Sequence, residues 1–299
     1  MSHELDAVYA RVPWLAGAGE PRRLAGLTNV NYRLGPYVVR LPGAGTHEYI
    51  DRVAEERAAR AAADAGVSVE VLFFDTSDGL MVTRFLEGAA TMSAEAFRAD
   101  DGAVERAADV MRRLHTGAAP FAVEFHLFEA IDEYRALLEA KRAPLPDGFA
   151  AVRLEAERSR RALAAHPVAH VPSHCDPLCE NFLDDGSRMR LIDYEYAGNF
   201  DPMWDLGDFS VEAGLTPDQD EVLLRAYFAG APPAADRARM VVHQAMCDVL
   251  WSLWGILQHA NDNPVEDFWA YGCRRFERCR ELMATERFRH SLDVLEVGS

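Results

Sequence analysis

The first third of the chain alternates short apolar runs with glycine and proline, a pattern that predicts β-strands joined by turns. Between the third and fourth runs, the stretch from Thr46 to Gly66 is dense in Ala, Glu and Arg, which predicts a helix closed by the glycine. Two later runs lie on either side of a turn at residues 75–79. The predicted strands are Arg23–Leu27, Asn31–Leu34, Tyr37–Leu41, Ser68–Phe74 and Leu80–Phe85.

Most of the remaining chain has apolar residues at helical spacing, as in Asp101–His115. One segment, His170–Asp193, breaks this pattern with a loop and two short predicted strands. We therefore expect an α+β fold in which an N-terminal sheet lobe, residues 1–87, is followed by a helical lobe, residues 88–299. Further helices are expected at Leu127–Arg142, Ala150–His166, Pro217–Ala229, Ala234–His259 and Val265–Thr285.

Composition narrows the class of protein. The formal net charge of −17 over 299 residues argues against nucleic acid or an anionic membrane as a partner. The five cysteines have no paired CxxC spacing and fit reduced thiols. The N-terminus has no basic, apolar leader pattern, and no continuous apolar run approaches the roughly 20 residues of a membrane span. We expect a cytoplasmic protein without membrane insertion. Lys141 is the only lysine, so chemistry usually given to lysine falls to arginine.

The most informative segment runs from His174 to Asp193. Asp176 follows His174 by two residues, Asn181 follows Asp176 by five, and Asp193 comes twelve residues later, after a predicted strand. Phosphoryl transfer needs a carboxylate that orients the acceptor and oxygen ligands for a divalent metal. Taken singly, these residues could be ordinary polar loop positions. The ordered set, on a loop–strand–strand pattern, favours a phosphotransferase site.

The residues 191–198 (LIDYEYAG), the step Asp205-Leu206-Gly207 and Glu212 resemble the choline kinase branch of the aminoglycoside phosphotransferase and choline/ethanolamine kinase superfamily. The resemblance implies a two-lobed, protein-kinase-like fold. It also implies that Asp176 is the catalytic base, that Asn181 and Asp193 bind Mg²⁺, and that Asp205 braces the loop that His174 opens.

The same resemblance implies an ATP site in the N-terminal lobe. The segment 26–32 (GLTNVNY) is similar to the family's phosphate-covering turn, which suggests Thr28, Asn29 and Asn31 as nucleotide contacts. Arg40 falls where this branch places a phosphate-pairing arginine. Glu55 is its expected partner, with the adjacent Glu56 as the alternative.

The expected substrate site depends on aromatic residues. Trp251 and Trp254 are three apart on a predicted helix and so share a face, and Phe268 and Tyr271 repeat that spacing. Aromatic faces attract a quaternary ammonium by cation–π interactions. The resemblance adds Tyr196, Glu195 and Glu212 as substrate contacts. The alternative for such pairs is core packing.

These observations predict an ATP- and Mg²⁺-dependent kinase for a small cationic amino alcohol, choline first and ethanolamine second. Other cationic acceptors, an aminoglycoside or thiamine, stay open as alternatives. A protein kinase is disfavoured because no activation segment separates Asp193 from the helical region. A catalytically silent nucleotide-binding module is the remaining alternative.

Overall fold

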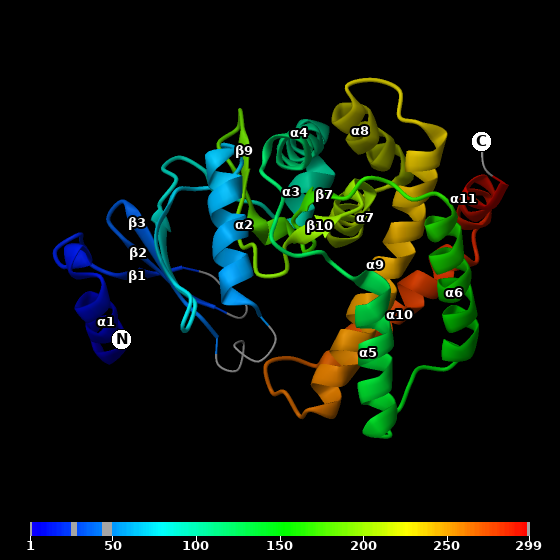
Figure 1. The fold of residues 1–299 in the computed structure, drawn as a ribbon, viewed down its shortest axis with the longest axis horizontal. Coiled ribbons are helices and arrows are strands. Elements are labelled where there is room, and N and C mark those ends of the chain that lie inside the picture. The colour runs from blue at the N-terminus through cyan, green and yellow to red at the C-terminus, as the bar shows by residue number, and fades with distance from the viewer. Residues whose placement is uncertain (1, 25–28, 44–49, 298–299) are drawn as a thin grey trace.

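The structure, a computed structural model, describes residues 2–24, 29–43 and 50–297. An antiparallel sheet forms one end of the molecule and helices form the other (Figure 1). The sheet has the strand order β1-β2-β3-β5-β4. Its strands are β1 (Arg22–Arg23), β2 (Val30–Leu34), β3 (Tyr37–Leu41), β4 (Val71–Asp75) and β5 (Leu80–Arg84).

The two faces of the sheet have different partners, because successive strand residues point in opposite directions. Val39 lies in a buried cluster with Leu5 and Val8 of α1 (Ser2–Arg11), a helix that the sequence analysis did not predict. The next residue, Arg40, reaches the other face and contacts Glu55 of α2 (Arg52–Asp64). Figure 1 shows α2 between the sheet and the helical part.

Helix α2 begins later than predicted. The Asp51 carboxylate accepts hydrogen bonds from the backbone N–H groups of Val53 and Ala54, both at 3.0 Å, which fixes the helix start after Asp51. Residues 46–49 lie outside the described residues. The rest of the prediction, an alanine-rich helix, is confirmed, and its alanines pack into the core shared with the helical part.

The helical part contains two small sheets and a ring of helices around a long central helix. Its strands are β6 (Ala90–Thr91), β7 (Val171–Ser173), β8 (Phe182–Asp184), β9 (Met189–Leu191) and β10 (Gly198–Phe200). A short 3-10 helix, η3 (Cys179–Asn181), precedes β8, and another, η1 (Pro13–Leu15), lies in the N-terminal part. Its helices are α3 (Ala94–Ala99), α4 (Asp101–Gly117), α5 (Leu127–Ala140), α6 (Phe149–Ala165), α7 (Pro202–Ala213), α8 (Pro217–Phe228), α9 (Ala234–Ala260), α10 (Phe268–Met283) and α11 (Glu286–Val297). The predicted α+β fold is confirmed.

Helix α9 is the core helix of this part. By length and mean hydropathy it could cross a membrane, although it has no continuous apolar run of that length. Within its most apolar window, 94% of the residues are buried inside the protein, so packing accounts for its composition. Helix α7 lies directly against it. A Cβ atom on Gly207 would lie 3.0 Å from the Met240 carbonyl oxygen, so a larger residue here would push the two helices slightly apart.

A buried ion pair ties α7 to α9 at their ends. The Asp201 carboxylate caps α7 by accepting a hydrogen bond from the Met203 N–H at 3.0 Å. The same side chain accepts from Arg239 Nε at 2.7 Å and contacts His243 Nε2 at 2.9 Å, both on α9. Burial acts to raise the pKa of Asp201, but His243 and Arg239 outweigh it and lower the pKa below its usual range. The ionised carboxylate therefore stabilises the fold.

Candidate active site

The loop before Asp176 is held by one buried carboxylate. Asp205 on α7 accepts hydrogen bonds from the backbone N–H groups of His174 at 2.7 Å and Cys175 at 2.9 Å. His115 Nε2 lies 2.9 Å from the same carboxylate. Burial opposes ionisation of Asp205, but His115 and the loop contacts keep its pKa below its usual range. Asp205 therefore holds the backbone of this loop in place.

The loop is also joined to the strand that carries Asp193. His174 is fully buried, and its Nε2 lies 2.8 Å from the Ile192 carbonyl oxygen. Asn181 Nδ2 donates to the Asp176 carbonyl oxygen at 3.1 Å, and the Ile192 N–H donates to the Asn181 carbonyl at 2.9 Å. These bonds hold the segments of Asp176, Asn181 and Asp193 together. His174 connects the two segments through its ring and is a positioning residue.

Asp176 is half-buried among like charges. Burial raises its pKa to about 8, with further increases from Glu212 and Asp193 and an opposing effect of Arg275. A carboxylate whose pKa lies near neutrality can accept a proton from a hydroxyl more readily than an ordinary one. Glu212, Asp193 and Arg275 lie close enough to Asp176 for their charges to change its pKa.

On one side of Asp176 lies a charged cluster, which we define as Arg40, Arg52, Glu55, Asp193 and Glu195. Oxygen atoms of its three carboxylates lie within 4.8 Å of one another. Arg40 is ion-paired with Glu55, lies 3.1 Å from Asp193 Oδ1, and donates to the Gly79 carbonyl at 3.3 Å. Arg52 Nη1 lies 2.7 Å from Glu55 and 2.8 Å from Glu195. Burial and Glu195 raise the pKa of Asp193 to about 7, against the effect of Arg40.

The donor set of the charged cluster together with Asn181 fits Mg²⁺ and phosphate. Carboxylate and amide oxygens are the ligands that Mg²⁺ prefers, and Asp193 and Asn181 supply one of each. Guanidinium groups match phosphate oxygens in charge and geometry, and Arg40 supplies one. Glu55, rather than Glu56, contacts Arg40, because Glu56 pairs with Arg60 on the outer face of α2.

The predicted phosphate-covering turn is only partly described. Asn29 Nδ2 donates to Glu195 Oε1 at 3.1 Å, and its Oδ1 accepts from the Gly43 N–H at 3.1 Å. Asn31 lies on β2, directly opposite Arg40 on β3. Thr28 lies outside the described residues.

A second group of side chains is an aromatic cluster, which we define as Tyr196, Trp251, Trp254, Phe268 and Tyr271. The Trp254 ring lies edge-on to three of the others, with centroid distances of 5.4 Å to Phe268, 5.9 Å to Tyr271 and 6.0 Å to Trp251. Tyr196 lies 5.8 Å from Trp251. Trp251 Nε1 is buried and has no hydrogen-bond partner among the described residues. Edge-on contacts also occur in ordinary cores, so the arrangement alone does not distinguish a binding site from packing.

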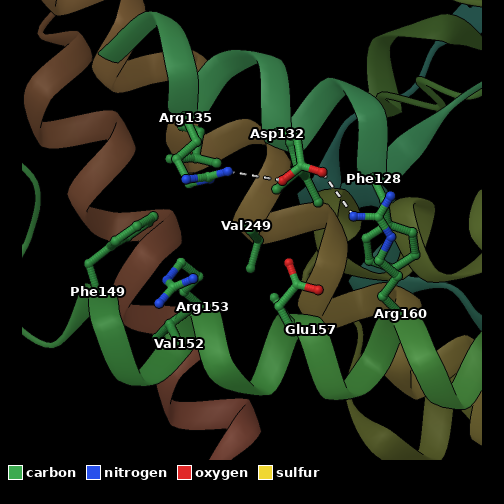
Figure 2. A pocket seen from close by; sticks show the side chains of 12 residues that line it. Phe128, Asp132, Arg135, Phe149, Val152, Arg153, Glu157, Arg160 and Val249 are labelled. Carbon is green, nitrogen blue, oxygen red and sulfur yellow. Dashed lines mark hydrogen bonds and ion pairs between the residues drawn. The ribbon is translucent and has the colours of Figure 1, made fainter. Parts of the chain in front are cut away.

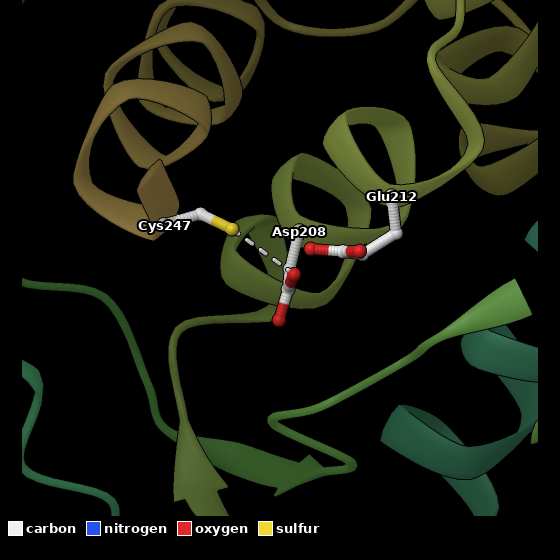
Figure 3. A group of neighbouring side chains, drawn as sticks. All are labelled: Asp208, Glu212 and Cys247. Carbon is white, nitrogen blue, oxygen red and sulfur yellow. Dashed lines mark hydrogen bonds between the residues drawn. The ribbon is translucent and has the colours of Figure 1, made fainter. Parts of the chain in front are cut away.

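A buried arginine, Arg275, contacts both Glu212 and the aromatic cluster. Arg275 on α10 is ion-paired with Glu212, lies 3.2 Å from Asp248, and places its guanidinium 4.9 Å from the Tyr271 ring centroid. Figure 3 shows Glu212 beside Asp208 on α7, with Cys247 facing them from α9. The Cys247 thiol donates to Asp208 Oδ1 at 3.1 Å.

Three features of the site were not found from the sequence. Arg52 and Arg275 belong to no motif, and only the scarcity of lysine indicated that arginines would carry the positive charge. Glu195 was predicted as a substrate contact, yet its described partners, Asn29, Arg40 and Arg52, all come from the N-terminal part. The structure therefore places Glu195 in the charged cluster.

A separate pocket lies between α5, α6 and α9 (Figure 2). Its floor includes Phe128 and Val249, and Asp132 and Arg160 form an ion pair at its edge. The cavity volume of about 20 Å³ is enough for a water molecule but not for a nucleotide or an amino alcohol. None of the predicted site residues lines it.

Comparison with known proteins decides the family. The model of the phosphotransferase enzyme family matches residues 21–241. The chain belongs to this family. Its structure is similar to that of a choline/ethanolamine kinase family protein from Mesorhizobium loti, with a TM-score of 0.94, 49% identity and 99% of both chains covered.

Two further relatives of this phosphotransferase are more distant. Choline kinase LicA from Streptococcus pneumoniae superposes with a TM-score of 0.80 and 27% identity, over 94% of this chain and 99% of that one. Protein LicA of Haemophilus influenzae is 27% identical over 275 residues, which cover 87% of this chain and 78% of that protein. The family resemblance, the protein-kinase-like fold and the phosphotransferase class predicted from the sequence are confirmed.

Proposed function

We propose that this phosphotransferase is an ATP-dependent kinase that phosphorylates the hydroxyl of choline and, less efficiently, of ethanolamine. The observation that supports this most directly is that Asp176 lies near Asp193 and Glu195 of the charged cluster and also near Glu212 and Arg275, which border the aromatic cluster. The charged cluster suits a nucleotide triphosphate with its metal, and the aromatic cluster suits a methylated cation. The similarity to the Mesorhizobium loti protein and to LicA supports the same substrate class.

In this proposal the two lobes, residues 1–87 and 88–299, divide the work. The N-terminal lobe binds ATP, with Arg40 on the phosphates and Glu55 holding Arg40 in place. Asn181 and Asp193 hold Mg²⁺, which screens the charge of the phosphates when bound. Asn29, Asn31 and Thr28 belong to the turn that covers the phosphates. Because the reaction consumes ATP, we propose that the enzyme is cytoplasmic.

The helical lobe orients the acceptor. The aromatic cluster binds the ammonium group, so that the hydroxyl at the other end of the molecule reaches Asp176. The hydroxyl oxygen forms a bond to the γ-phosphorus as the bond between this phosphorus and the bridging oxygen of ADP breaks. Asp176 accepts the hydroxyl proton, and Asp205 and His174 keep its loop in place.

A coupled ADP-release assay tests the proposal, with choline, ethanolamine, thiamine and several aminoglycosides as acceptors and Mg²⁺ present. We expect turnover with choline above all the others, and none after chelation of the metal. Turnover only with an aminoglycoside or thiamine would replace the substrate. Binding of ATP without turnover for any of these acceptors would instead favour a silent nucleotide-binding module.

A further inference from the structure

Glu212, the carboxylate that we expect to face the substrate cation, already has a partner within the protein. Glu212 is ion-paired with Arg275, and the two side chains are only 13% and 8% exposed. The guanidinium also lies over the Tyr271 ring, at 4.9 Å from its centroid. The guanidinium of Arg275 therefore engages the Glu212 carboxylate and one face of Tyr271, a member of the aromatic cluster.

The neighbouring acidic groups are also engaged. Asp248 lies 2.6 Å from Arg278 Nε in addition to its contact with Arg275. Asp208 accepts from the Cys247 thiol, is completely buried, and has its pKa raised well above the usual range by burial, Glu212 and Asp176. Of the described carboxylates around Arg275 other than Asp176, Glu212 and Asp248 are thus paired with arginine, and Asp208 is sealed from solvent.

The two candidate amino alcohols need different partners. A primary ammonium has three N–H donors, and burying them without acceptors costs free energy. A trimethylammonium has no such donors, and aromatic faces alone can bind it. A site whose carboxylate is held by an arginine therefore penalises the primary ammonium more than the quaternary one.

We propose that Arg275 determines substrate choice: by engaging Glu212, it makes the site select a quaternary ammonium alcohol over a primary amino alcohol. This inference rests on the proposed function. Arg275 acts on the substrate through Glu212, so it is a positioning residue; its charge also lowers the pKa of Asp176, an effect that both alcohols share. Removal of its guanidinium leaves Asp248 paired with Arg278 and frees Glu212 to accept hydrogen bonds from a primary ammonium.

The test compares kcat/KM for choline and for ethanolamine in the wild-type enzyme and in Arg275→Gln. We expect the choline-to-ethanolamine ratio to fall by about tenfold, since one buried charged hydrogen bond changes affinity by at least that factor. The change should appear mainly in KM for the amino alcohols, and KM for ATP should not change. Arg274→Gln, at an exposed position on the same helix, is the matched control and should keep the wild-type ratio.

Three further variants separate this role from a structural one. Arg275→Lys keeps the buried charge and should keep the preference for choline. The double variant Glu212→Gln/Arg275→Gln removes the freed carboxylate and should restore that preference. If Arg275→Gln does not fold, Arg275→Met retains the apolar stem and serves in its place. A ratio within twofold of wild type in the folded Gln or Met variant overturns the inference, whereas a wild-type enzyme inactive on both alcohols overturns the proposed function instead.

Discussion

The charged cluster and the aromatic cluster are built on different principles. In the charged cluster, two arginines and three carboxylates are in direct contact, and nearly every side chain has a partner of opposite charge. In the aromatic cluster, rings contact one another edge-on, and the nearest ion pair, Arg275 with Glu212, lies at its margin.

The difference indicates two modes of recognition. Arginines that are held by carboxylates can exchange partners with a phosphate, because both offer oxygen acceptors with negative charge. Aromatic faces attract a cation without donating or accepting hydrogen bonds, so they can bind a group that has lost its N–H donors. Substitutions on each side should therefore affect different kinetic constants.

The largest effect is expected at Asp176, the proposed base. Asp176→Asn removes the proton acceptor but retains the size of the side chain. Because a general base typically contributes about 10²–10⁴ in rate, kcat should fall by that factor. Calorimetry should show that both ATP and choline still bind. If the variant retains wild-type turnover, Asp176 is not the base.

The second prediction concerns the buried ion pair between Asp201 and Arg239, which holds together two helices that carry proposed substrate-binding residues. Asp201→Asn breaks a buried ion pair that ties α7, which carries Glu212, to α9, which carries Trp251. We expect a loss of about 3–5 kcal/mol in the free energy of unfolding, because Arg239 keeps its charge without its partner. Urea unfolding at pH 7 measures this loss.

The same variant has a defined pH dependence. The pKa of Asp201 is lowered in the folded protein, so its stabilising contribution is fully present above the unfolded pKa of about 3.9 and is lost as pH falls through the folded pKa. The difference in the free energy of unfolding between wild type and Asp201→Asn should stay at its neutral-pH value down to about pH 5. It should shrink below about pH 4. A difference that grows on acidification would contradict the ion-pair explanation.

The third prediction tests the charged cluster. Arg40→Lys keeps the charge but loses the planar fork that reaches Glu55 and Asp193 together. We expect KM for ATP to rise about tenfold, with KM for choline unchanged, because a charged hydrogen bond contributes about 1.5–3 kcal/mol. Arg33→Lys, on the neighbouring strand and paired with Glu87, is the control. An equal rise in both KM values would show that the two clusters are not separate in function.

The smallest effect is expected in the aromatic cluster. Trp254→Leu removes one ring that is half-buried and contacts three others. Because a cation–π contact at a partly exposed ring contributes about 0.5–1 kcal/mol, KM for choline should rise about 2- to 5-fold, with KM for ATP unchanged. Trp269→Leu, a ring that packs against His259, should change neither constant. An unchanged KM for choline in Trp254→Leu would indicate that the aromatic cluster is core packing.

Local pattern predicted the elements that have one buried face. Strands β2 to β5 and helices α4 and α5 lie close to their predicted ranges. Helix α9 is buried on nearly all sides, but its 27 residues still distinguish it from a strand. Helix α7 is buried in the same way but has only 12 residues and contains Gly207, so it has neither an amphipathic period nor a typical helix-forming sequence and was missed. Helices α1, α3 and α11 were not predicted, and α3 has only six residues.

The candidate site was predictable where its residues are close along the chain. Asp176, Asn181 and Asp193 flank one hairpin, so their spacing already implied that they lie near one another. Arg52 and Arg275 reach the site from separate helices, and a single arginine on a helix has no sequence feature that distinguishes it from a surface charge. Their contacts depend on the tertiary packing of α2 and α10.

Asp193 has a left-handed backbone, with φ of 69°, which costs a residue with a side chain about 1–2 kcal/mol. It also brings a third carboxylate within 4.8 Å of Glu55 and Glu195. Asp193→Gly would relieve both the backbone conformation and the crowding of negative charge. We expect this variant to melt at a higher temperature than wild type while losing its phosphotransferase activity. Heat tolerance and turnover then make opposite demands on one residue, and selection for thermostability alone would favour loss of the proposed metal ligand.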